Sequence, residues 1–312
     1  MTLLEFPDGK LFAFSIVGDT DCATVANVRP IYELLHQLGM RTTKTIWPIP
    51  GHHPSDPNAP AQPVTDPEYL SFLRQLQEWG FEIGLHNVRS YSSPREEIER
   101  GLAAFRRITG HPPRIHANHM FNQDGLYWRE ARLDSWFLRW AYGVQCRRRG
   151  LPPSEGHVQG SPYFWGDFCQ REVDYVRGFT FPEINALKIN PTLPYRDSRR
   201  PYARLWFSGS DASNCEEFNR LMAHDNQEQL EREQGVCIVA THLASGFVKD
   251  GEVEPRAKAL LTELAGRRGW FVPVSELLDF LVKKNGERQL PWLERQRMQW
   301  RWMISRLLRS AT

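Results

Sequence analysis

The sequence predicts an α/β fold in the form of a closed or nearly closed (β/α) barrel. Short apolar runs of strand type alternate with amphipathic segments of helix period, a pattern that favours a parallel sheet. The chain has 312 residues, and barrels of this kind commonly contain about 250. No internal repeat or low-complexity linker marks a second domain. We therefore expect one barrel over residues 1–285, followed by a basic, Trp-rich amphipathic helix over residues 286–312.

The first part of the chain contains three strand–helix units and a long loop. Runs rich in β-branched and aromatic residues predict strands at Lys10–Val17, Arg41–Trp47 and Phe81–His86. Apolar residues at helical spacing, capping residues and terminal glycines predict helices at Thr24–Leu38, from Asp66 to Gly80, and from the Ser93 capping box to Gly110. The segment Pro48–Thr65, dense in Pro, His and Asp and containing His52 and His53, is a loop.

The remainder alternates in the same way after an irregular middle. Strands are predicted at Arg114–Asn118, Val236–His242 and Trp270–Pro273, and helices start near Asn214, Pro255 and Ser275. The segment Tyr127–Trp206 has no clean period.

Composition excludes several functional classes. The 39 Lys and Arg nearly balance the 37 Asp and Glu, so the chain lacks the basic excess of a nucleic-acid-binding protein. Its five cysteines are scattered and form no C-x-x-C pair, which argues against a zinc finger and a disulfide framework. The start MTLLEFPDGK has no basic segment before an apolar run, so we expect no signal peptide and a cytoplasmic protein.

Polar residues of catalytic type follow several predicted strands. Because the carboxyl ends of parallel barrel strands lie on one face, we expect these side chains to share one site. They are Asp19 and Asp21 after the first strand, His86 after the third, His116 and His119 around the fourth, and His242 after the late strand. Asp and His together suit a divalent metal, Zn²⁺ first, with Mn²⁺, Fe²⁺ and Co²⁺ as alternatives. Taken singly, each His has a structural alternative, and either Asp could instead cap the helix near Thr24.

Three segments resemble the polysaccharide deacetylase superfamily of carbohydrate esterases: FAFSIVGDTD, GFEIGLHNVRS and VCIVATHL. The resemblance covers roughly residues 10–281 and is weakest in the middle. It implies a distorted (β/α) barrel that removes acetyl groups from sugars by means of a metal-activated water. The family holds its metal with one Asp and two His, and uses a further Asp as base and a late His as acid.

Carried over to this chain, the resemblance assigns Asp19 and His86 to the metal, Asp21 to the base and His242 to the acid. The family's base position is Gly18 here, and the second His of its H-x-x-x-H motif falls on Ser90. His119, or else His116, would replace that second histidine.

Other residues have types that suit sugar binding. We predict substrate contacts from His116, Trp165, Asp167 and Arg196; the alternative is that Arg–Asp pairs stabilise irregular loops. The run Arg147–Arg149 is either a solvated surface or a contact for an anionic sugar or phosphate.

The sequence thus favours a metal-dependent hydrolase that removes an acyl group from a sugar or polysaccharide precursor. The alternative is a degenerate barrel that binds glycan without a metal and without hydrolysis, and glycosidic cleavage ranks last because no facing carboxylate pair is evident. The expected partner is an acylated carbohydrate and not a nucleic acid.

The C-terminal segment has the apolar pattern of a helix. From Trp300 onward, apolar residues recur at helical spacing, namely Trp300, Met303, Ile304, Leu307 and Leu308. The pattern therefore predicts one of three roles for the C-terminal helix: packing on the barrel, self-association, or peripheral contact with the inner face of a membrane.

Overall fold

Parallel strands form a closed ring at the centre of the molecule. The structure is a computed structural model that describes residues 4–51 and 61–310, with side chains up to residue 306; His52 and His53 lie outside the described residues. Within these residues the ring contains seven parallel strands, which confirms the predicted barrel. In ring order they are β1 (Phe12–Gly18), β2 (Thr43–Ile46), β3 (Glu82–Leu85), β4 (Ile115–His116), β5 (Tyr175–Phe181), β7 (Leu205–Asp211) and β8 (Val236–Thr241), and β8 pairs with β1.

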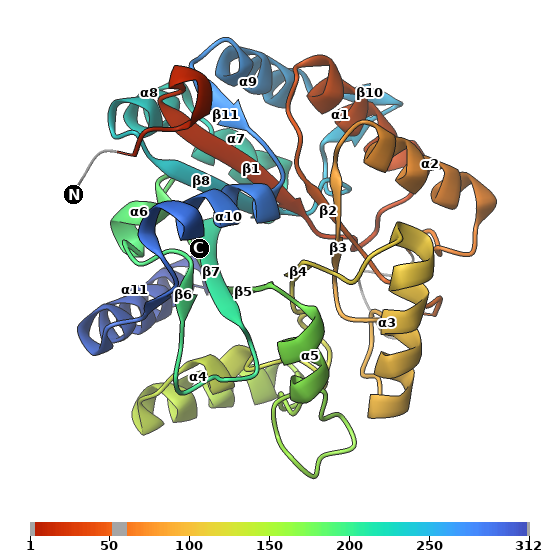
Figure 1. Cartoon of the computed structure of the whole chain (residues 1–312), viewed down its shortest axis with the longest axis vertical. Helices are drawn as coiled ribbons and strands as arrows, with labels where there is room; N and C mark the ends of the chain where they lie inside the picture. The colour runs from red at the N-terminus through yellow and green to blue at the C-terminus, as the bar shows by residue number, and fades with distance from the viewer. Residues whose placement is uncertain (1–3, 52–60, 311–312) are drawn as a thin grey trace.

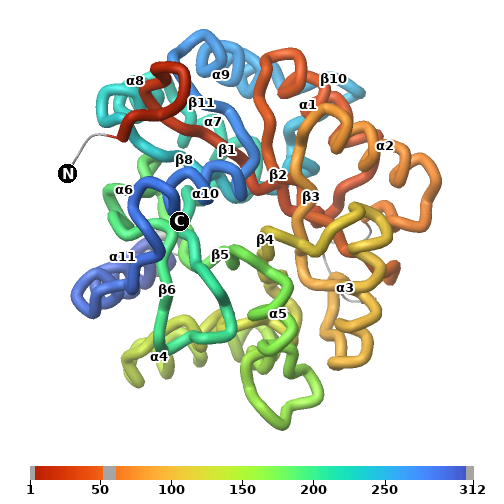
Figure 2. Tube along the Cα trace, viewed as in Figure 1, coloured from red at the N-terminus to blue at the C-terminus, as the bar shows by residue number. Residues whose placement is uncertain are grey.

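The barrel is distorted where the two ends of the chain meet. The start of β1 pairs with β11 (Gly269–Phe271), whereas its last two residues pair with β2. Figure 2 shows the late strand β11 beside the N-terminal strand β1. β1 and β2 are therefore hydrogen-bonded only at the carboxyl end of β1, and the ring is irregular at the amino end of β1. The remaining strands are β6 (Tyr195–Arg196), β9 (Val248–Lys249), β10 (Glu252–Val253) and β12 (Arg288–Gln289).

Helices surround the ring (Figure 1). They are α1 (Val25–Gln37), α2 (Pro67–Glu78), α3 (Arg95–Thr109), α4 (Trp136–Arg148), α5 (Gly166–Glu172), α6 (Ala186–Ile189), α7 (Cys215–Leu221), α8 (His224–Arg232), α9 (Pro255–Ala265), α10 (Val274–Asn285) and α11 (Trp292–Ser310), with short 3-10 helices η1 (Pro7–Gly9) and η2 (Arg129–Arg132).

Most of the predicted helix boundaries are confirmed, and one cap is not. Asp66 caps α2 with Pro67 as its first residue, and Thr24 caps α1 with a reciprocal bond from Asn27. Thr24 thus does the capping that Asp19 or Asp21 could have done. The Ser93 capping box is wrong, because α3 starts after Pro94 without a side-chain cap. The Ser93 amide instead donates to Asp124.

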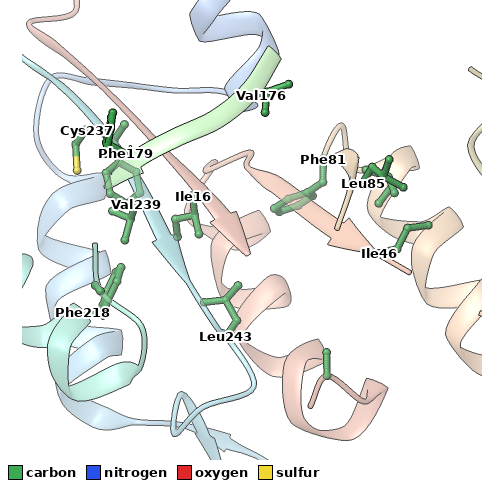
Figure 3. Packing of buried hydrophobic residues seen from close by; sticks show 14 of the residues in the cluster. Ile16, Ile46, Phe81, Leu85, Val176, Phe179, Phe218, Cys237, Val239 and Leu243 are labelled. Atoms are coloured by element: carbon green, nitrogen blue, oxygen red, sulfur yellow. The ribbon is translucent and has the colours of Figure 1, made fainter. Parts of the chain in front are cut away.

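The core lies on both sides of the barrel strands. All seven residues of β1 are buried, as are all seven of β5, because helices cover the outer face of each strand and the barrel interior covers the other. Figure 3 shows the resulting cluster, to which Ile16 of β1, Ile46 of β2, Phe179 of β5 and Val239 of β8 contribute.

Periodicity missed two barrel strands, β5 within the irregular middle of the sequence and β7 at its end. The strand β5 reads YVRGFTF, and it places Arg177 and Thr180 on the lining of the central cavity. These polar residues interrupt the apolar pattern, and the pairing of β5 with β7 shifts register between them. A strand that carries part of a site therefore lacks the uniform apolar run by which a buried strand is recognised.

The C-terminal helix α11 packs on the barrel, which is one of the predicted alternatives. Trp302 is 1% exposed and its ring contacts Tyr142 of α4 and Phe179 of β5. The buried face differs from the predicted one, because Trp300 and Ile304 are about half exposed. The side chains of Leu307 and Leu308 lie outside the described residues. Within the described part of the chain, no helix combines the length and apolar character needed to span a bilayer. Peripheral membrane contact stays a prediction.

Candidate active site

The predicted strand ends do converge on one cavity at the carboxyl face of the barrel. This cavity, which we call the central cavity, has a volume of about 440 Å³. Its lining includes the residues predicted from four strands, namely Asp19, Asp21, His86, His119 and His242.

Asp21 is the centre of the polar cluster. Its Oδ1 lies 3.0 Å from Nε2 of His119, and its Oδ2 lies 3.1 Å from Nε2 of His86. All three side chains are almost completely buried. Burial opposes ionisation of Asp21, but the charges of the two imidazoles and hydrogen bonds from His119 and His242 outweigh it and hold the Asp21 pKa well below its usual range.

The second ring nitrogen of each histidine has a fixed role. Nδ1 of His86 lies 3.0 Å from the carbonyl oxygen of Ala117, which can only accept, so this nitrogen carries a proton. Nδ1 of His119 lies 2.9 Å from Oδ1 of Asn122, whose amide nitrogen donates to two backbone carbonyls. Both histidines are therefore oriented with Nε2 towards Asp21, as metal-bound histidines are when a neighbouring acceptor fixes the tautomer.

These three residues fit a divalent cation. One ligand atom from each of Asp21, His86 and His119 lies within 4.8 Å of the others. In its neutral form each imidazole, protonated at Nδ1, presents a lone pair at Nε2, and a bound cation takes the place of the Nε2 proton that faces Asp21. The ring of Trp47 lies against His86 and meets His119 edge-on, which restricts both imidazoles. One carboxylate and two imidazoles is a frequent catalytic set for Zn²⁺ and related metals.

Asp19 has a different partner, Arg177 of β5. The guanidinium donates to both carboxylate oxygens, with N–O distances of 2.9 and 2.6 Å. Burial opposes ionisation of Asp19, but the Arg177 charge and hydrogen bonds, together with His86 and His242, outweigh it and lower its pKa. Asp19 is thus held as an oriented carboxylate. Its nearest approach to His86 is 3.9 Å, at the Nδ1 that already donates to Ala117.

The geometry therefore groups Asp21, and not Asp19, with the two histidines. This differs from the predicted division, in which Asp19 is the ligand and Asp21 the base. The position before Asp19 has no room for a side chain, because a Cβ at Gly18 would approach the buried Tyr32 hydroxyl to 2.7 Å. An acid at position 18, where the resemblance places the base, would have to displace Tyr32.

His242 stands on the open side of the cluster. Its Nδ1 donates to the carbonyl of Ser213, and its Nε2 lies 3.4 Å from Oδ2 of Asp21. Burial lowers the pKa of His242, but the hydrogen bond and charge of Asp21, with Asp19 and the Ser213 carbonyl, outweigh it and raise the pKa to about 9. The imidazolium can therefore donate a proton near neutral pH.

The comparisons with solved structures agree with this architecture. A protein of Mycobacterium smegmatis assigned as a polysaccharide deacetylase matches with a TM-score of 0.52 and 13% identity, over 93% of this chain and 97% of its own. The chain has the polysaccharide deacetylase fold. The likeness is one of structure, since no known family model and no curated protein matches the sequence.

Two further solved structures match with lower TM-scores. A family 4 acetyl xylan esterase from Clostridium thermocellum, in complex with a cobalt ion, has a TM-score of 0.41 and 13% identity, over 90% of this chain and 98% of its own. The peptidoglycan deacetylase PdaC of Bacillus subtilis has a TM-score of 0.44 and 11% identity, over 89% of this chain and 95% of its own.

The four residues predicted to contact substrate do not line the central cavity, and a substrate role for them stays a prediction. His116 is fully buried, and burial lowers its pKa to about 3 while its ring packs against Trp165. Trp165 donates to the backbone of Asp124. Asp167 pairs with Arg95, and Arg196 pairs with Glu287. All four side chains take part in packing or in ion pairs. For Asp167 and Arg196 the ion pairs match the predicted alternative, in which such pairs stabilise irregular loops.

Several residues of the cavity were missed by sequence reasoning. Arg177, Trp128, Arg132 and Tyr142 come from the irregular middle, and Trp302 and Arg306 come from α11. No local motif marks them, because they come one or two at a time from elements that are far apart along the chain. The pattern Asn118–His119–x–x–Asn122 did contain a signal: an amide three residues after a candidate ligand can accept its Nδ1 proton.

Proposed function

We propose that this protein is a metal-dependent hydrolase that removes an acyl group from an acylated sugar. The observation that carries the proposal is the cluster of Asp21, His86 and His119, in which both Nε2 atoms face the carboxylate with their Nδ1 protons engaged elsewhere. These three residues would hold the cation, Zn²⁺ or a related ion. A cation held there polarises the acyl carbonyl and lowers the pKa of water.

The remaining steps belong to the chain's own residues. Asp19, oriented by Arg177, accepts a proton from the attacking water as oxygen adds to the acyl carbon. His242 donates its Nε2 proton to the sugar nitrogen or oxygen as the bond to the acyl carbon breaks. The products are a carboxylate and the free amine or alcohol. In this scheme Asp19 is the base and Asp21 the ligand, the reverse of the predicted roles.

The test combines metal analysis with a panel of acetylated sugars. We expect one divalent ion per chain in the wild type, a loss of at least tenfold in His86→Ala, and no change in the control His111→Ala, whose imidazole is exposed and bonds to the Pro112 carbonyl. Acetate release should follow metal content. Glycan binding with neither metal nor acetate release would favour the degenerate barrel instead.

A further inference from the structure

Arg132 is a buried arginine whose side chain forms no ion pair with an acidic residue in the described part of the chain. It lies in η2, is 7% exposed and lines the central cavity. Its guanidinium lies 3.8 Å from the ring centre of Trp128 and 4.6 Å from that of Trp302. Among the residues that the structure describes, no carboxylate is within ion-pair distance and no acceptor takes a hydrogen bond from its side chain.

The other buried arginines show what a satisfied site looks like in this protein. Arg129, in the same short helix, donates to the carbonyls of Met120 and Asn122. Arg177 binds Asp19. Arg200 and Arg295 both bind Asp197. Within the described part of the chain, Arg132 is the exception, and a buried charge without a partner destabilises the fold unless something else pairs with it.

A second unpaired cation lines the same cavity. Arg149 follows α4, is exposed, and forms no ion pair with any described residue. The acids of the cavity are already engaged: Asp19 by Arg177, Asp211 by Arg306, and Asp21 by the histidines. Arg132 and Arg149 are therefore excess positive charge in a cavity that would hold substrate.

Electrostatics agree with this arrangement. Burial, with the nearby charges of Arg306 and Arg177, lowers the pKa of Arg132 to about 9, against the opposing effect of Tyr142. Arg132 still carries a full charge at neutral pH. The charges of Arg132, Arg306 and Arg149 act on the Tyr142 hydroxyl, and the Tyr142 ring packs on Trp302. Several cations thus surround one part of the cavity.

We propose that Arg132 and Arg149 form an oxyanion subsite, so that the substrate is an acylated sugar bearing a carboxylate or phosphate. This inference rests on the proposed function. Trp128 and Trp302 both pack against the Arg132 guanidinium, and a planar guanidinium offers two parallel N–H donors to an oxyanion. Arg149 adds charge at the rim of the cavity. For the run Arg147–Arg149, the sequence predicted either a solvated surface or an anion contact. In this proposal Arg149 alone makes the anion contact.

The test measures preference for an anionic sugar. Calorimetric binding of N-acetylglucosamine 6-phosphate and N-acetylmuramic acid is compared with that of N-acetylglucosamine, using the metal-loaded protein. We expect the wild type to bind at least one anionic sugar tenfold or more tightly than the neutral one. The ratio should fall at least fivefold in Arg132→Met, whose side chain keeps the packing between the two tryptophans, and in Arg149→Met. Arg147 is an exposed arginine two residues earlier, on α4, that does not line the cavity, and Arg147→Met should keep the wild-type ratio.

The possible failures are distinguishable. Equal wild-type affinity for charged and neutral sugars overturns the subsite and leaves the hydrolase untouched. If Arg132→Met is less stable but keeps the ratio, Arg132 is only a packing element between two tryptophans, and the subsite is overturned. If Arg132→Met does not fold, the exposed Arg149→Met decides the outcome. Anion preference without acetate release supports the subsite and contradicts the proposed hydrolase.

Discussion

Arg177 of β5 holds both carboxylate oxygens of Asp19 across the barrel, with N–O distances of 2.9 and 2.6 Å. Asp21, two residues later, turns instead towards His86 and His119. Two acids from one strand end thus enter different environments, one facing a permanent cation and the other facing the Nε2 atoms of two imidazoles. This difference separates the proton acceptor from the ligand in the proposed reaction.

Exchanging each acid for its amide should separate the two roles. Asp19→Asn removes the proton acceptor, so we expect acetate release to fall about 10²–10⁴-fold while metal content stays at the wild-type level. Asp21→Asn should lower metal content at least tenfold, because it removes the anionic ligand. Metal analysis and acetate release on the same preparations check both. Loss of metal from Asp19→Asn with retention in Asp21→Asn would restore the division of roles predicted from sequence.

Asn122 should matter to the metal through His119. Its Oδ1 accepts the Nδ1 proton of His119, and replacing such an acceptor costs about 10–100-fold in metal affinity. We expect that loss in Asn122→Ala, measured by competition with a chelator. Asn122→Asp keeps an acceptor for His119 but loses the hydrogen bonds to the Arg89 and Tyr91 carbonyls, so it should recover only part of the affinity. Equal affinity in the alanine variant and the wild type would mean that Trp47 packing alone orients His119.

Two tryptophans on α11 should differ sharply in their effect on stability. Trp302 is buried against Tyr142 and Phe179, so Trp302→Ala should lower the free energy of unfolding by about 3–5 kcal/mol. Trp300 is about half exposed, and Trp300→Ala should cost less than about 1 kcal/mol. Urea denaturation of both variants checks this. Similar small losses would indicate that α11 is loosely attached to the barrel.

His157 should make the fold sensitive to acid. One of its ring nitrogens accepts from the Tyr127 amide, and burial, together with the charges of Arg200 and Arg139, lowers its pKa to about 4. The unfolded chain, with a His pKa near 6.5, binds the proton more readily. The contribution of this group is therefore complete above pH 6.5 and is lost as the pH falls from 6.5 towards 4.

Replacing His157 should flatten that dependence. Between pH 7 and pH 4 we expect the wild type to lose about 2 kcal/mol more than His157→Gln, a value reduced for partial exposure. Urea midpoints across this pH range provide the measurement, with His111→Gln as the control for an exposed histidine. If the His157→Gln curve runs parallel to the wild-type curve, the imidazole is not buried in its neutral form.

The sequence by itself determined the barrel and most of its active face. Alternating strand and helix periods predict the parallel ring. The sequence also shows polar residues at the ends of apolar runs: Asp19 and Asp21 after β1, His86 after β3, and His242 after β8. Parallel strands in a barrel end on one face, so the convergence of these residues follows from topology without coordinates.

Only the tertiary structure decided which acid binds which partner. Asp19 meets Arg177, which is 158 residues away on a strand whose apolar run is interrupted, and Tyr32 leaves no room for a side chain at Gly18. The cations Arg132 and Arg149 reach the cavity from elements that no motif marks. Pairing across such distances depends on side-chain packing in three dimensions, whereas local sequence encodes period and caps.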